Sequence, residues 1–156
     1  MPSAVAQPVV LLMEDSDDDA FFFKRTLRQV GFTGALTHVT DGAEAVAHLE
    51  RTLRADGTPL PDLVFLDLKI PRLNGFEVLE WIRGQSFVRP LDVAVLSGSE
   101  HAGDVERALA LGATTYYVKP ILAQQLKLRL AAWQEKQSPR AGAENVPAAS
   151  ARTSAP

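Results

Sequence analysis

Five short apolar runs alternate with longer stretches of helical period, and this alternation constrains the fold more than any other feature of the sequence. The runs lie at residues 9–13, 35–39, 63–66, 93–96 and 116–118. Three of them are almost wholly apolar, as strands buried on both faces of a parallel sheet are. Alternation of this kind is typical of a parallel sheet covered by helices on both faces. The sequence therefore predicts an α/β fold built from five strand–helix units.

The stretches between the runs carry helix start and stop signals at their ends. Ser16 with Asp19 is expected to cap the first helix, and Gly31 to end it in the left-handed conformation. Asp41 with Glu44 forms the corresponding cap of the second helix. The remaining helices are predicted from about residue 75, over 105–111 and over 122–137. Five amphipathic helices are thus expected to cover the sheet.

Length, composition and charge narrow the class of protein. A chain of 156 residues, 46% of them hydrophobic, suits one folded domain, predicted here over residues 8–137. The absence of cysteine excludes disulfides and cysteine-based catalysis. A formal net charge of -3 gives no long-range attraction for nucleic acid or anionic lipid, so neither is expected as a partner. The early apolar run is too short to span a membrane and no basic residue precedes it, so the expected location is the cytoplasm.

Residues 138–156 differ in composition from the rest of the chain. Of these 19 residues, six are Ala, three are Pro and three are Ser, and Val146 is the only large aliphatic residue. Such a segment buries too little apolar surface to fold, so it is predicted to be a disordered tail.

Polar side chains follow four of the five predicted strands. Ligands of open α/β sheets bind beyond the carboxyl ends of the strands, so these positions are the first to inspect for chemistry. The residues there are Glu14 and Asp15 after the first strand, Asp67 after the third, Ser97 after the fourth, and Lys119 and Pro120 after the fifth. Three carboxylates, one hydroxyl and one ammonium are therefore expected to meet at one edge of the sheet.

Three crowded carboxylates repel one another, and a divalent cation with a preference for oxygen ligands, Mg²⁺, relieves that repulsion. Asp67 would then lie beside a bound cation, with Lys119 and Ser97 placed to contact an incoming phosphoryl group. This arrangement predicts a phosphoryl-transfer site with Asp67 as the nucleophile. Residues 17–19 are all Asp; they are assigned to the first helical turn, where negative charge favours the helix dipole, rather than to metal binding.

The chain resembles the receiver domains of two-component response regulators over about residues 8–137. The resemblance rests on four blocks in family order: Leu-Met-Glu-Asp at 12–15, Leu-Val-Phe-Leu-Asp-Leu-Lys-Ile-Pro at 63–71 with Asn74-Gly75, Val-Leu-Ser-Gly at 95–98, and Gly112-Ala113 leading to Tyr-Tyr-Val-Lys-Pro at 116–120. It implies a flavodoxin-like doubly wound fold with parallel strand order 2-1-3-4-5. It also implies a single-domain regulator, similar to chemotaxis regulators and to the partners of phytochrome-type kinases.

The resemblance implies a role for each residue at this edge. Asp67 corresponds to the phosphoacceptor, Asp15 to a direct Mg²⁺ ligand, and Glu14 to a residue that helps through water. The backbone carbonyl of Lys69 corresponds to a further metal ligand.

Four more positions correspond to the phosphoryl-binding and switch residues of the family. Lys119 would contact the phosphoryl oxygens, and its bond to Pro120 is expected to be cis. Ser97, which stands where threonine is commoner, would hydrogen-bond the phosphoryl group. Tyr116 would then turn from solvent toward the core and alter the face made by the fourth helix, fifth strand and fifth helix.

The leading hypothesis is a receiver that takes a phosphoryl group from a sensor histidine kinase or a phosphotransfer protein. With no effector domain expected after the fifth helix, its output would come from a downstream protein partner or from a homodimer formed through the fourth helix, fifth strand and fifth helix. The receiver itself is not expected to be a metabolic enzyme. One alternative is a Mg²⁺-dependent aspartyl-phosphate hydrolase of the haloacid dehalogenase type, although Lys69 occupies the position where such enzymes need a second acid. The other is a scaffold that works without phosphorylation.

Overall fold

The computed structural model describes residues 5–54 and 56–137, so the predicted tail at 138–156 lies outside the described residues. Five parallel strands form one sheet in the order β2-β1-β3-β4-β5, which confirms the predicted fold class and strand order. The strands are β1 (Val10–Met13), β2 (Leu36–Val39), β3 (Leu63–Leu66), β4 (Asp92–Ser97) and β5 (Thr115–Val118). Strand β4 is longer than predicted by one residue at each end.

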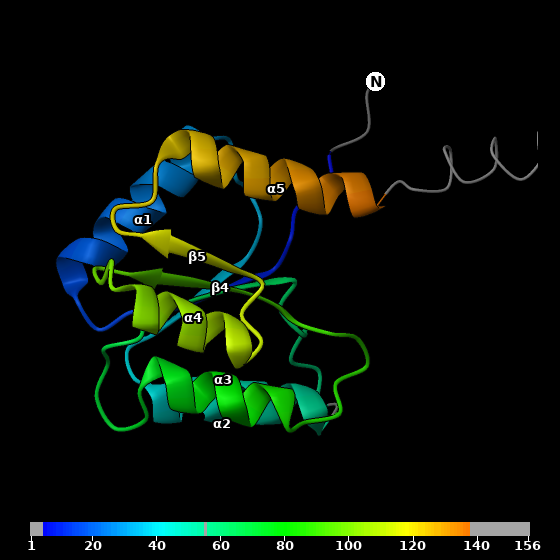
Figure 1. Ribbon diagram of the computed structural model, residues 1–156. Helices are drawn as coiled ribbons and strands as arrows, with labels where there is room; N and C mark the ends of the chain where they lie inside the picture. Colours follow the sequence, from blue (N-terminus) through cyan, green and yellow to red (C-terminus); the bar gives the residue numbers. More distant parts are fainter. Residues whose placement is uncertain (1–4, 55, 138–156) are drawn as a thin grey trace, which may run out of the picture.

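Helices cover both faces of this sheet (Figure 1). One face carries α1 (Asp17–Gln29) and α5 (Ala123–Gln137). The other carries α2 (Gly42–Leu53), α3 (Gly75–Arg83) and α4 (Ala102–Ala110). No helix among residues 5–54 and 56–137 has the length and apolar character needed to cross a membrane.

Two hydrophobic cores result, because successive side chains of a strand point to opposite faces of the sheet. In β1, Leu11 and Met13 pack toward α2, α3 and α4, whereas Val10 and Leu12 pack toward α1 and α5. All four side chains are at most 1% exposed. The apolar run of β1 is therefore a strand buried on both faces of the sheet. The strands β2 and β5 lie at the two ends of the sheet order, and their side chains are mostly only partly buried, which agrees with their less apolar sequences.

Both predicted helix caps form, neither of them as a reciprocal box, and α3 begins with a further cap that was not predicted. Asn74 and Glu77 close a complete capping box at the start of α3. At α1, the Ser16 hydroxyl accepts from the Asp19 backbone N–H at 3.2 Å, yet the Asp19 side chain does not return to Ser16. The backbone N–H of Ser16 donates instead to Glu14 Oε2 at 3.1 Å. The Asp19 carboxylate is thereby left to bind elsewhere.

Candidate functional site

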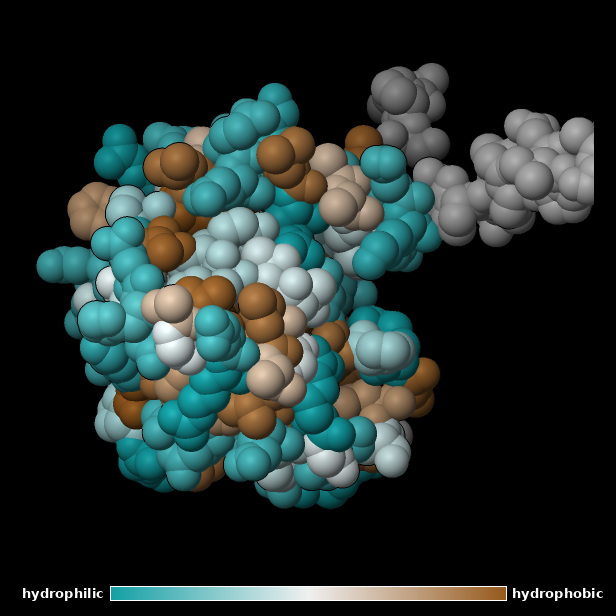
Figure 2. All heavy atoms as spheres, in the orientation of Figure 1, coloured by the Kyte–Doolittle hydropathy of each residue, from teal (hydrophilic) through white to brown (hydrophobic). Residues whose placement is uncertain are grey.

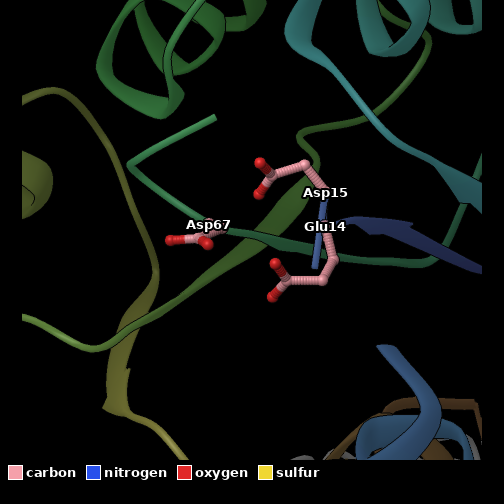
Figure 3. Close-up of side chains that lie close together, drawn as sticks. All are labelled: Glu14, Asp15 and Asp67. Carbon is pink, nitrogen blue, oxygen red and sulfur yellow. The ribbon is translucent and has the colours of Figure 1, made fainter. Parts of the chain in front are cut away.

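Three carboxylates meet where β1 and β3 end. The two strands are adjacent and in register, with Met13 opposite Leu66, so Glu14 and Asp67 leave the sheet side by side. Figure 3 shows their side chains grouped with that of Asp15. One carboxylate oxygen from each of the three residues lies within 4.8 Å of the others. Glu14 and Asp67 are buried, and Asp15 is exposed.

Lys119, in the connection between β5 and α5, reaches into this cluster. Its Nζ lies 2.6 Å from Glu14 Oε1, 2.8 Å from Asp19 Oδ2 and 2.9 Å from Asp67 Oδ2. The backbone N–H of Lys119 donates to the Ser97 carbonyl at 2.8 Å and holds the residue beside β4. The Lys119–Pro120 peptide bond is cis, as expected. The Lys119 ammonium therefore contacts carboxylates from three segments, the loop after β1, the first turn of α1 and the loop after β3.

Burial and ion pairing shift the pKa values of Lys119 and Glu14 in opposite directions. Burial lowers the pKa of Lys119, but hydrogen bonds to Asp19, Glu14 and Asp67 outweigh it and raise the pKa above its usual value. Burial raises the pKa of Glu14, and the hydrogen bond from Lys119 opposes that rise only in part. Lys119 thus stays protonated at neutral pH, whereas burial disfavours the charged form of Glu14.

The charges at this edge do not balance. Four carboxylates, those of Glu14, Asp15, Asp19 and Asp67, surround the single Lys119 ammonium. A divalent cation with oxygen ligands removes the excess negative charge. The Glu14, Asp15 and Asp67 oxygens offer an all-oxygen donor set of the kind that Mg²⁺ prefers, so the residues present fit this metal.

The predicted hydroxyl and switch residues are linked to each other through Ser99. Ser97 is fully buried, and its Oγ accepts from the Ser99 N–H at 3.2 Å. The Ser99 hydroxyl donates to Asp104 Oδ2 of α4 at 2.6 Å. The Tyr116 hydroxyl donates to the Ser99 carbonyl at 2.9 Å. The loop after β4 is thereby bonded to both α4 and β5.

The Tyr116 side chain lies against the core, with its hydroxyl hydrogen-bonded to the loop after β4. Its side chain is half-buried and packs against the core beneath α2, α3 and α4. The Ser99 carbonyl lies within reach and supplies a partner for the hydroxyl, which allows a tyrosine to be held inward. The turn of Tyr116 on phosphorylation stays a prediction.

Two residues at the site were missed in the sequence. The sequence pattern places Asp19 with the helix dipole, yet it contacts Lys119, which lies one hundred positions further along the chain. The signal was present, because side chains in a first helical turn tilt toward the helix N-terminus, here the edge with the polar strand ends. His38 of β2 donates its Nε2–H to the Glu14 carbonyl at 2.8 Å, since Lys24 donates to its Nδ1 at 3.1 Å. His38 therefore supports the backbone at Glu14.

Lys69 lies next to the candidate nucleophile. Its backbone N–H donates to Asp67 Oδ1 at 3.3 Å, and its side chain is exposed. On the opposite side, a cavity of about 320 Å³ runs from Lys119 and Asp19 along α1, with Phe22, Phe23 and Ile121 in its apolar wall. The cavity thus borders the site at Glu14, Asp19 and Lys119.

Comparison with known proteins gives the same family from sequence and from structure. Residues 10–131 match the family model of the response regulator receiver domain. The chain is 34% identical over 119 residues to the probable methanogenesis regulatory protein FilR2 of Methanothrix harundinacea, covering 76% of each protein. It is 32% identical over 111 residues to the response regulator Rcp1 of Synechocystis, covering 71% of this chain and 76% of Rcp1.

Solved structures agree. The bacteriophytochrome response regulator RtBRR superimposes with a TM-score of 0.70 at 31% identity, covering 83% of this chain and 78% of RtBRR. The Mn²⁺-bound form of Rcp1 gives a TM-score of 0.65 at 28% identity, covering 82% and 92% of the two chains. With the strand order and the acidic cluster, these matches show that the chain belongs to the receiver domain family of two-component response regulators.

Proposed function

We propose that Asp67 accepts a phosphoryl group from a sensor histidine kinase or a phosphotransfer protein, in a step that requires Mg²⁺. The observation that carries the proposal is the meeting of Asp67 with Glu14, Asp15 and Lys119 at one sheet edge. The phytochrome association in the name of RtBRR makes a kinase of that class the first donor to test.

The transfer forms a bond between an Asp67 carboxylate oxygen and phosphorus and breaks the bond from phosphorus to the donor's histidine nitrogen, which keeps the electron pair. Glu14, Asp15, Asp67 and the Lys69 carbonyl would hold the metal, and Mn²⁺ bound to Rcp1 supports this assignment. Bound Mg²⁺ supplies positive charge to the phosphoryl oxygens.

Two further groups of the chain assist. Lys119, already 2.9 Å from Asp67 Oδ2, exchanges that contact for a phosphoryl oxygen. Ser97 donates its hydroxyl to another phosphoryl oxygen, which draws the loop after β4 toward Asp67.

Phosphorylation would act on the face of α4, β5 and α5 through that loop. Ser99 bonds to both Tyr116 and Asp104, so a shift of the loop moves β5 and α4 together. Phosphorylation would favour the arrangement in which the Tyr116 hydroxyl donates to the Ser99 carbonyl, as a population shift.

The face that responds also carries apolar side chains. Figure 2 shows hydrophobic residues over α4 and α5 on the side turned toward the viewer. Exposed large hydrophobic residues in or next to these elements are Leu109, Val118, Leu122 and Leu128. We infer that this face binds the downstream protein or a second copy of the chain.

Intact-mass measurement tests the proposal. Incubation with acetyl phosphate and Mg²⁺ is expected to add one phosphoryl group to the wild type, none to Asp67→Asn, and none when a chelator removes Mg²⁺. Asp56→Asn, an exposed aspartate in the loop after α2, is the control and should be labelled like the wild type.

Two results would overturn the proposal. A protein that gains no phosphoryl group from acetyl phosphate or from a phosphorylated kinase would act as a scaffold. Rapid release of phosphate from varied phosphate esters would identify a hydrolase instead.

A further inference from the structure

We propose that Asp19 is a positioning residue that holds the Lys119 ammonium in place for phosphoryl transfer. The inference rests on the proposed function, since it assigns a task to Lys119 during that reaction. Asp19 lies on α1, contacts Lys119 and is less exposed than Asp17 and Asp18.

The ammonium of Lys119 has three hydrogens and three carboxylate partners. Glu14 and Asp67 are two of these partners, and both also belong to the group that would hold the metal. Asp19, at 2.8 Å from Nζ, is the third and lies outside that group. When Glu14 and Asp67 give oxygens to Mg²⁺, Asp19 is the carboxylate that remains fully available to Lys119.

Lysine needs such a partner because its ammonium sits on a flexible four-carbon stem, which loses rotamer freedom when the charge is fixed. Asp67 cannot supply a lasting contact, since phosphorylation converts one of its oxygens to the bridging oxygen of an acyl phosphate. Asp19 lies on α1, away from the transferred group, and keeps its oxygen throughout. The ammonium is therefore held where the phosphoryl oxygens arrive.

A comparison of the three consecutive aspartates of α1 distinguishes a specific contact of Asp19 from a general effect of negative charge. Asp17 and Asp18 are exposed, whereas Asp19 is half-buried with 45% of its side chain accessible. The Asp19 side chain also does not accept from the Ser16 backbone N–H, which donates to Glu14 instead. At α3 the corresponding bond forms, from the Asn74 N–H to the Glu77 side chain. The side chain is thus directed to Lys119 in preference to its local partner.

The kinetic test compares Asp19→Asn with Asp18→Asn, which removes the same charge from the same helical turn. Phosphorylation of Asp67 by acetyl phosphate is followed by intact mass over a range of Mg²⁺ concentrations. Asp19→Asn is expected to lower the maximal rate about fivefold, the scale of a partly exposed ion pair. Asp18→Asn should stay within about twofold of the wild type.

The Mg²⁺ concentration that gives half the maximal rate supplies a second readout. It should change less than about threefold in Asp19→Asn, because Asp19 is not in the metal group, and rise strongly in Asp15→Asn. Equal rates for Asp19→Asn and Asp18→Asn would overturn the inference, as would a loss of rate in Asp19→Asn that excess Mg²⁺ restores.

A double-mutant cycle shows whether Asp19 acts through Lys119. The unfolding free energies of the wild type, Asp19→Asn, Lys119→Ala and the double variant are measured in urea, which needs no phosphorylation. Non-additive effects are expected for the contacting pair, and additive effects would overturn the inference. Failure of the wild type to become phosphorylated would instead refute the proposed function itself, so the two failures are distinguishable.

Discussion

At the scale of single residues, burial determines the charge state of His48 on α2. The side chain is only 9% exposed, and Arg51 lies 3.3 Å from its Nδ1. Since a guanidinium can only donate, Nδ1 accepts, and the ring is neutral with its proton on Nε2. Burial first, and then the charge of Arg51, lower the pKa of His48 below 6.5.

This shift predicts a pH dependence of stability. Below pH 6.5 His48 binds a proton more readily in the unfolded chain than in the folded protein. The contribution of neutral His48 to the unfolding free energy is therefore fully present above pH 6.5 and is lost as the pH falls through the folded-state pKa. Urea unfolding at pH 7.5 and pH 5.5 should show a fall in the wild type and a smaller fall in His48→Gln. His101→Gln, at an exposed position before α4, should keep the wild-type fall. Identical falls in all three proteins would contradict the prediction.

At the scale of elements, the start of α3 is packed directly against the backbone that carries Asp67. A Cβ built on Gly75 would lie 2.4 Å from the Asp67 carbonyl oxygen and 2.6 Å from the Leu68 Cα. The Gly75 N–H donates to the Leu68 carbonyl at 2.9 Å. Any larger residue at 75 must therefore move the segment that positions the candidate nucleophile.

Gly75→Ala is accordingly expected to cost about 1–3 kcal/mol of unfolding free energy, the range for overpacked sites, and to slow the phosphorylation of Asp67. Gly103→Ala is the matched control, because Gly103 lies in the first turn of α4 with no atom within 4 Å of an added Cβ. That variant should be neutral or more stable by up to about 1 kcal/mol, since alanine favours helix. Urea unfolding and intact mass check both. A Gly75→Ala protein as stable and as reactive as Gly103→Ala would show that α3 does not constrain Asp67.

At the scale of the whole molecule, the proposed face of α4, β5 and α5 links phosphorylation to assembly. If the chain pairs through it, acetyl phosphate should shift the protein from monomer toward dimer in sedimentation experiments. Leu122→Asp places a charge at a 59% exposed apolar position on this face and should weaken the dimer by more than about tenfold.

Val88→Asp is the control for that experiment. Val88 is 94% exposed but lies in the connection between α3 and β4, at the amino ends of the strands, so its substitution should leave the dimer intact. Equal weakening by both variants, or no dimer in the phosphorylated wild type, would contradict the dimer proposal. A monomer that binds a downstream protein would then be the form that signals.

Sequence alone determined the order of the elements and the positions where polar residues leave the sheet. Both depend on local rules: apolar runs mark strands, caps and glycines mark helix ends, and parallel strands bring their carboxyl ends to one edge. Glu14, Asp15, Asp67, Ser97 and Lys119 could therefore be singled out before any coordinates, although their chemical roles remain proposals.

Only the tertiary structure decided which side chains contact one another within that edge. It separated Asp19 from its two neighbours, held Tyr116 inward on the Ser99 carbonyl, and placed His38 beneath Glu14. The physical reason is that these contacts join residues distant in sequence, and their formation depends on the direction of each side chain after the helices have packed on the sheet. Local pattern sets where a residue leaves its element, whereas packing sets what it meets.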